Sequence, residues 1–159
     1  MRFAPLAGFP VIVIEDVSWG DMDSFQHVGN TVYFEYFQNA RIDYMTRLGW
    51  FTLMKQEGLG PIVASTQARF RKPVTYPDRI HIGARVVAVE SDRVTFEHRL
   101  VSERWGDVAA EGQCVIVSMD YKSQKKTGLP ASIRAGIERL ETAAKMEKPG
   151  SPHNGDPGE

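Results

Sequence analysis

The sequence of 159 residues contains only one cysteine, Cys114. A single thiol excludes an intramolecular disulfide and a zinc–thiolate cluster, and it is typical of a protein from the reducing cytoplasm. The 19 basic and 20 acidic residues leave a formal net charge of −1, so no overall charge attracts nucleic acid or an anionic membrane. No apolar run approaches the roughly 20 residues of a membrane-spanning helix, and the first residues make a poor secretory signal. We therefore expect a cytoplasmic protein with no nucleic-acid partner and no membrane span.

Internal repeats and linker-like segments are also missing before residue 147. Residues 147–159 differ from the rest, because they contain three prolines, three glycines and no large apolar side chain. Such a composition cannot bury enough apolar surface to become ordered. We therefore expect one domain over residues 1–146 and a disordered C-terminal tail over residues 147–159.

The spacing of apolar side chains predicts a strand followed by a long helix. Residues 9–17 are rich in Val and Ile, which is typical of a strand. Residues 31–48 then carry apolar side chains at helical spacing around most of the circumference, which predicts a largely buried helix. Gly49 stands where a C-terminal glycine is expected, and a short helical piece follows at residues 50–57.

Most of the later chain alternates between apolar and polar residues. Four such segments, 62–70, 80–88, 94–100 and 108–119, predict strands of an antiparallel sheet with one covered face. A last helix is expected after Leu129-Pro130. This order of elements predicts an α+β fold in which a curved antiparallel sheet wraps around one long buried helix.

Residues 18–41, SWGDMDSFQHVGNTVYFEYFQNAR, place two aspartates and a histidine directly before the buried helix. The residues alone leave three interpretations open. The aspartates can simply form turns, with Asn30 or Thr31 as the helix N-cap. Asp21 and Asp23 can bind Mg²⁺ for phosphoryl chemistry, although no second acidic cluster with a lysine accompanies them. They can also carry catalysis, since loops between elements often do.

The same run resembles the signature of the hotdog-fold acyl-CoA thioesterases of the 4-hydroxybenzoyl-CoA thioesterase-like family, D-x-D-x-x-x-H-V-N-N-x-x-Y-x-x-Y-x-x-x-A-R. Two later segments, F-R-K-P-V-T-Y-P-D-R-I and L-P-A-S-I-R, also resemble that family, so that the likeness covers about residues 9–140. The resemblance implies a hotdog fold and hydrolysis of an acyl-CoA to free acid and CoA, with no metal or other cofactor. It also implies a homodimer or homotetramer with the active site at a subunit boundary.

The resemblance assigns roles to individual residues of the first motif. Asp23 is implied as the catalytic carboxylate, nucleophile or general base, with Asp21 in support and His27 as a possible assistant or a structural group. The backbone amides near Gly29, Asn30 and Thr31 are expected to form the oxyanion site, because the first turn of a helix has unpaired N–H groups and a positive dipole end. Each such donor is typically worth about 3 to 4 kcal/mol. Many members carry Asn where this chain has Gly29, which leaves the fine substrate specificity open.

Substrate-binding residues are predicted less specifically. Tyr33 is expected in the core or in the lining of an acyl pocket, and Cys114 in the core. A cationic rim for the phosphates of CoA is expected from three neighbouring side chains, Arg69, Arg71 and Lys72, or from the lysines at 122–126. A thiolate leaves without a strong general acid, since its reference pKa is roughly 8.5, and this is consistent with the absence of a G-x-S-x-G motif.

Three alternatives to acyl-CoA hydrolysis remain open. The same fold can act on the thioester of an acyl carrier protein, or it can hydrate an enoyl thioester. A non-catalytic module that only binds acyl thioesters is a different class, and it would have no need of a carboxylate beside an oxyanion site.

Overall fold

The computed structural model describes residues 3–147 of the 159. The elements in chain order are η1 (Ala4–Leu6), β1 (Val11–Asp16), η2 (Trp19–Asp21), α1 (Asn30–Arg47), α2 (Trp50–Glu57), β2 (Leu59–Phe70), β3 (Arg79–Val89), β4 (Arg93–Ser102), β5 (Asp107–Asp120), β6 (Lys125–Lys126) and α3 (Ala131–Met146). The predicted tail lies outside the described residues except for Glu147. None of the helices among residues 3–147 has both the length and the apolar character needed to cross a membrane.

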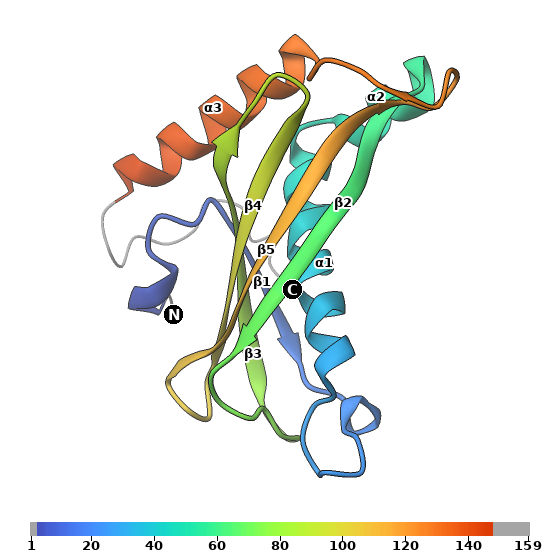
Figure 1. Ribbon diagram of the computed structural model, residues 1–159. Coiled ribbons are helices and arrows are strands. Elements are labelled where there is room, and N and C mark those ends of the chain that lie inside the picture. Colours follow the sequence, from blue (N-terminus) through green and yellow to red (C-terminus); the bar gives the residue numbers. More distant parts are fainter. Residues whose placement is uncertain (1–2, 148–159) are drawn as a thin grey trace.

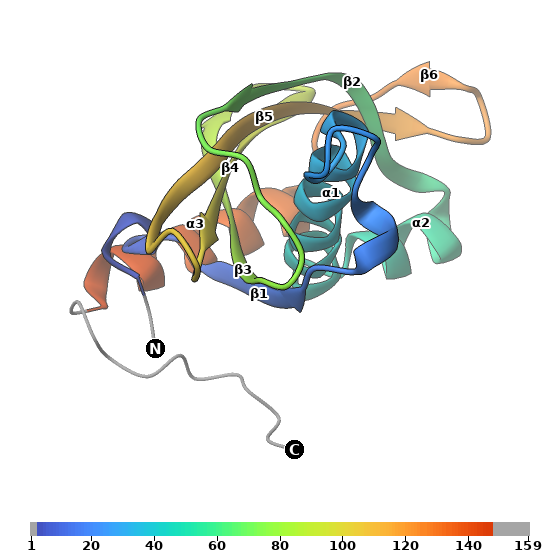
Figure 2. The ribbon, with the colours of Figure 1, turned by 90° about the horizontal axis from the view of Figure 1, so that it is seen from below.

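Five long strands form one antiparallel sheet in the order β1-β3-β4-β5-β2, and the short β6 pairs with β5. The sheet curves, and α1 lies along its concave face (Figure 1). The view from below shows the strands arching over α1 (Figure 2). This is the predicted α+β hotdog arrangement of a curved sheet around one long helix, and the prediction is confirmed.

The core lies between α1 and the concave face of the sheet. Tyr33, Phe37, Ala40 and Tyr44 are all buried there, as the helical spacing predicted. Gly112 on β5 allows the closest approach, because a Cβ at that position would lie only 2.7 Å from the ring of Phe37. The helix runs from Asn30 to Arg47 rather than from residue 31 to residue 48, and the expected glycine follows it with φ of +73°.

Strand β2 differs from the prediction of one covered face. Its residues from Val63 to Gln67 are exposed, and the Val63 side chain is 50% exposed. The sequence pattern cannot say which strand lies at an edge, and β2 is paired only on its β5 side. A shift of register between Val63 and Ser65 also breaks the strict alternation. Strand β2 therefore offers one free edge of the sheet.

The other side of the sheet is closed by helix α3. Strand β1 pairs with β3 only as far as Ala84. Beyond that point the Glu141 carboxylate on α3 accepts hydrogen bonds from the Val86 N–H, at 2.8 Å, and from the Tyr44 hydroxyl, also at 2.8 Å. Helix α3 thus takes the place of a neighbouring strand beside the second half of β3 and joins it to α1.

Candidate active site

The loop that precedes α1 is fixed to the helix through Asp21. One oxygen of the Asp21 carboxylate accepts hydrogen bonds from the Tyr36 hydroxyl at 2.8 Å and from the Ser18 N–H at 3.2 Å. The Asp21 carbonyl accepts a third from the Gly29 N–H at 3.1 Å. Burial, followed by the hydrogen bond to Asp21, raises the pKa of Tyr36, so its hydroxyl stays protonated as the donor. Asp21 is therefore the residue that positions the loop.

Asp23 lies in a tight turn within this loop. Its backbone N–H donates to the His27 carbonyl at 3.0 Å, and its Oδ1 accepts from the Phe25 N–H at 2.9 Å. Its other carboxylate oxygen, Oδ2, faces Gly29, since a Cβ built on that glycine would lie 3.7 Å from it. The Asp23 carboxylate therefore stands beside the amino end of α1.

The amino end of α1 carries no side-chain cap. Gly29 is the N-cap, and Asn30 is the first helical residue. The prediction that Asn30 or Thr31 would be the N-cap is therefore wrong; the chain turns into the helix one residue earlier. The Val32 N–H reaches the Gly29 carbonyl at 3.0 Å, whereas the N–H groups of Asn30 and Thr31 reach no acceptor within residues 3–147. Two backbone donors are thus available next to Asp23 Oδ2.

The surroundings of Asp23 are open in the single chain. Asp23 is exposed, and two aromatic side chains of the same loop, Phe25 and Trp19, are 77% and 73% exposed. Large apolar side chains of this kind usually mark a surface that is covered by another molecule.

The other predicted site residues take different positions. His27 is partly buried, with Nδ1 3.4 Å from the Val28 carbonyl and its ring stacked on Phe25. Tyr33 lies in the core, and its hydroxyl accepts a hydrogen bond from the Val74 N–H at 3.2 Å. Arg71 pairs with Glu111 at 2.8 Å.

A second group of residues, which the sequence did not single out, adjoins this loop. The Val28 N–H donates to the Val74 carbonyl at 2.8 Å, so the β2–β3 connection, residues 71–78, lies against the amino end of α1. A cavity of about 350 Å³ opens on this connection and is lined by Pro73, Thr75, Arg104 and Trp105. We call it the Trp105 cavity. The predicted rim residue Lys72 lies beside it, with Nζ 5.0 Å from the centre of the Trp105 ring.

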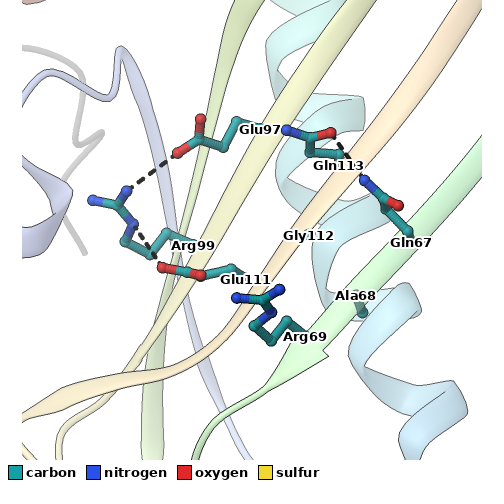
Figure 3. Close-up of a pocket in the computed structure, with 8 residues that line it drawn as sticks. All are labelled: Gln67, Ala68, Arg69, Glu97, Arg99, Glu111, Gly112 and Gln113. Carbon is teal, nitrogen blue, oxygen red and sulfur yellow. Dashed lines mark hydrogen bonds and ion pairs between the residues drawn. The ribbon is translucent and has the colours of Figure 1, made fainter.

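A larger cavity of about 440 Å³ lies on the convex face of the sheet, away from α1 (Figure 3). This outer-face cavity is lined by Gln67, Ala68, Arg69, Glu97, Arg99, Glu111, Gly112 and Gln113. Arg99 lies between Glu97, at 3.2 Å, and Glu111, at 3.9 Å, and Gln67 donates to Gln113. Its charged groups therefore largely satisfy one another.

The arrangement of the side chains bears on the predicted alternative of a metal site at the two aspartates. Among residues 3–147, no group of three or more His, Cys, Asp and Glu side chains is arranged to hold a metal ion. Asp21 and Asp23 also face different partners, the Tyr36 hydroxyl and Gly29. The geometry therefore gives no support to a shared Mg²⁺ site at the D-x-D pair.

Comparisons with known proteins establish the family of this chain. A sequence profile described as "Thioesterase-like superfamily" matches residues 17–137. The long-chain acyl-CoA thioesterase FadM of Escherichia coli is 24% identical over 119 residues, which cover 75% of this chain and 90% of FadM. A thioesterase from Thermus thermophilus, solved in complex with coenzyme A and Zn, is 31% identical, with a TM-score of 0.76 over 85% of this chain and 96% of that one.

A third relative, the uncharacterized protein YsmA of Bacillus subtilis, is 29% identical over 109 residues, which cover 69% of this chain and 72% of YsmA. The fold and these matches together define a thioester hydrolase with the hotdog fold. The chain belongs to the thioesterase-like superfamily, as the resemblance of residues 18–41 predicted.

Two residues of this region, Tyr36 and Trp105, carry only weak signals in the sequence. Tyr36 lies within the apolar helical segment 31–48, where nothing in the spacing marks its hydroxyl as the partner of an aspartate 15 residues earlier. Trp105 lies between two of the predicted strands, residues 94–100 and 108–119. A tryptophan in a turn is unusual, because such a large apolar ring normally seeks the core; this was the available signal.

Proposed function

We propose that the protein hydrolyses the thioester of an acyl-CoA, with Asp23 as nucleophile or general base. One observation carries the proposal: the Asp23 Oδ2 atom stands beside an amino end of α1 that has no side-chain cap. A carboxylate next to free backbone donors combines a base or nucleophile with an anion site. The reaction class and the relatives named above support the same function.

The chemistry follows from this placement. The thioester carbonyl oxygen would accept hydrogen bonds from the N–H groups of Asn30 and Thr31 and become negatively charged as the carbonyl carbon turns tetrahedral. Asp23 would attack that carbon directly, or it would take a proton from a water molecule whose oxygen attacks. When the intermediate collapses, the C–S bond breaks and the CoA thiolate leaves. When water is the attacking group, this collapse yields the free acid directly. When Asp23 attacks, the acyl group stays on the Asp23 carboxylate as an anhydride, which a water molecule then hydrolyses to release the free acid and restore Asp23. The products of both routes are the free acid and CoA, and no cofactor enters.

We further propose that a second copy of the chain completes the site in a homodimer or homotetramer. Water around Asp23 would weaken its electrostatic interactions, and Phe25 and Trp19 beside it are too exposed for a finished apolar surface. The free edge of β2 offers backbone donors and acceptors to another strand. A second copy of the chain would cover the exposed aromatic side chains and the free edge of β2. We also propose that the protein acts in the reducing cytoplasm, since it contains a single thiol.

A substrate panel tests the proposed function. Thiol release would be followed with straight-chain acyl-CoAs of increasing length, with aromatic acyl-CoAs and with acyl carrier protein thioesters. We expect wild type to release CoA from at least one acyl-CoA and Asp23→Ala to release almost none. Asp43→Asn provides the matched control, because Asp43 also lies on the loop–α1 segment but pairs with Arg47 at 3.2 Å, and it should retain full activity.

Three results would overturn the proposal. If the protein binds CoA esters without hydrolysing them, it is a binding module. If it hydrolyses only the thioesters of acyl carrier protein, the substrate is an acyl carrier protein thioester and not an acyl-CoA. Full activity of the Asp23→Ala variant would show that Asp23 is neither the nucleophile nor the general base. Treatment with EDTA is expected to leave the rate unchanged.

A further inference from the structure

The Trp105 cavity differs from the outer-face cavity in the charge of its wall. Its four lining residues carry one formal charge, the Arg104 guanidinium, and no carboxylate. The outer-face cavity is lined by two arginines and two glutamates, and Arg99 contacts both glutamates. An anion is therefore attracted to the first cavity, whereas in the second the carboxylates cancel the attraction.

The Trp105 ring is held in one position and yet remains accessible. Its indole N–H donates to the Pro73 carbonyl at 2.7 Å, and the Lys72 ammonium lies 5.0 Å from the ring centre. The side chain is still 49% exposed. A fixed, half-open aromatic ring offers a surface on which a flat heterocycle can stack.

Arg104 keeps most of its donors free. Its Nη1 donates to the Thr75 hydroxyl at 3.3 Å, and its backbone N–H donates to Asp78 at 3.1 Å. Among residues 3–147, no carboxylate forms an ion pair with its guanidinium, whereas Lys72 shares its charge with Asp107 at 3.4 Å. A guanidinium with free N–H groups is well suited to bind a phosphate.

The cavity lies close to the proposed active site. Pro73 and Thr75 flank Val74, whose carbonyl accepts the Val28 N–H at 2.8 Å, and Val28 precedes Gly29. Asp23 lies five residues before Val28, and successive Cα atoms are about 3.8 Å apart. The wall of the cavity beside Val74 is therefore within roughly 20 Å of Asp23. Figure 1 shows the β4–β5 hairpin, the β2–β3 connection and the loop before α1 at the same, lower end of the molecule. An extended pantetheine arm has a comparable reach.

We infer that the Trp105 cavity binds the phosphorylated adenosine of coenzyme A, with the adenine against Trp105 and a phosphate on Arg104. The pantetheine arm then follows the 71–78 connection and brings the thioester to Asp23. The inference rests on the proposed acyl-CoA substrate. Free adenine nucleotides share this chemistry, so the test must separate them from CoA.

Calorimetric titration of the full chain with CoA tests the site without catalysis. Trp105→Ala and Arg104→Ala should each raise the Kd of CoA roughly tenfold, whereas Trp105→Phe keeps an aromatic ring and should retain most of the affinity. Arg134→Ala is the matched control, because Arg134 is also an exposed arginine with one hydrogen bond, to the Glu90 carbonyl at 2.9 Å, and it should bind as wild type does. Unchanged affinity in both Trp105→Ala and Arg104→Ala overturns the inference, as does failure of wild type to bind CoA.

Kinetics with two forms of one substrate separate this inference from the proposed function. Trp105→Ala should raise KM for the acyl-CoA roughly tenfold and leave KM for the corresponding S-acyl-pantetheine, which lacks the nucleotide, unchanged. If Trp105→Ala leaves both KM values unchanged while wild type is active, the inference fails and the function stands. If wild type hydrolyses nothing but Trp105→Ala weakens CoA binding, the nucleotide site stands and the function fails.

Two further arms identify the ligand and the location. ADP should bind more weakly than CoA, and tighter binding of ADP that depends on Trp105 would assign the cavity to a free nucleotide instead. An Arg69→Ala variant that weakens CoA binding, while Arg104→Ala leaves it unchanged, would assign the nucleotide to the outer-face cavity. Either result overturns the inference.

Discussion

The two halves of helix α1 handle polar groups in opposite ways. At its amino end, the N–H groups of Asn30 and Thr31 lack acceptors within the described chain, and the carboxylate beside them is exposed. In its second half, Arg41 is buried and donates to His98 Nε2 at 3.2 Å, while His98 Nδ1 donates to the Gly83 carbonyl at 3.3 Å. The buried Arg41 and His98 side chains are paired and hold the fold, whereas the polar groups at the tip remain free for chemistry. Changes at the tip should therefore alter catalysis, and changes in the core should alter stability.

The largest expected effect is at the tip. Asp23→Asn should lower kcat/KM by roughly 10²- to 10⁴-fold, the usual contribution of a positioned base. The melting temperature should stay close to that of wild type, because Asn also has an oxygen that can accept the Phe25 N–H. Thiol-release kinetics and thermal unfolding of the same preparation check both parts. A large loss of stability would mean that Asp23 belongs with the structural groups.

A pH series tests the core half of α1. Burial, followed by the charge of Arg41, lowers the pKa of His98 to about 3. The unfolded chain takes up a proton near pH 6.5 that the folded chain refuses, so the free energy of unfolding should fall as the pH drops from about 6.5 toward 3. The slope should approach 1.4 kcal/mol per pH unit. Denaturant unfolding between pH 7 and pH 4.5 measures it.

The control for this series is a second buried histidine. His98→Gln should lose most of the slope, while His81→Gln, which alters a histidine paired with Glu103 at the edge of the core, should keep it. Equal slopes in wild type and His98→Gln would show that other groups set the acid sensitivity.

A smaller loss of stability is expected where α3 meets α1. Glu141→Ala removes the acceptor of the Val86 N–H and the Tyr44 hydroxyl, which should cost about 2 kcal/mol of unfolding free energy. Glu141→Gln keeps an acceptor oxygen, and since burial raises the pKa of Glu141, a neutral group should be tolerated with a smaller loss. Both variants should retain kcat near pH 7. A fall in kcat with unchanged stability would show that the second half of α1 contributes to catalysis, which contradicts the separation of a catalytic amino end from a structural second half.

The smallest effect is expected at Gly29. Its φ is −64°, which any residue can adopt, and an added Cβ would meet Asp23 Oδ2 at 3.7 Å, an ordinary contact. Gly29→Ala should therefore change stability by only about 0.5 kcal/mol and kcat by less than about threefold. Steady-state kinetics and thermal unfolding check this, and a collapse of kcat would show that the space beside the Asp23 carboxylate must stay open for the substrate.

The sequence predicted the long helix, the antiparallel strands and the last helix, because each has a periodic apolar face that local spacing records. It also predicted that Asp23 lies beside the helix end, through the resemblance of residues 18–41 to a family motif. It did not predict the Gly29 cap, because the point at which the chain enters the helix depends on the hydrogen bonds that Asp21 makes across the loop. Element ends are commonly displaced by a residue in this way.

Two other features could not be read from local spacing at all. Exposure of β2 depends on which strand lies at the edge of the sheet, and this is decided by pairing between segments far apart in sequence. The Trp105 cavity is built by two connections, residues 71–78 and the β4–β5 hairpin, about 30 residues apart. Neither segment has a recognisable binding pattern on its own.

The most direct test of the tip as the reaction centre is a structure of the Asp23→Asn protein with an uncleaved acyl-CoA that wild type hydrolyses. We predict that the thioester carbonyl oxygen lies roughly 2.7 to 3.1 Å from the backbone nitrogens of Asn30 and Thr31, with the residue 23 side chain facing the carbonyl carbon. A thioester bound elsewhere, out of reach of both the helix end and residue 23, would contradict this assignment.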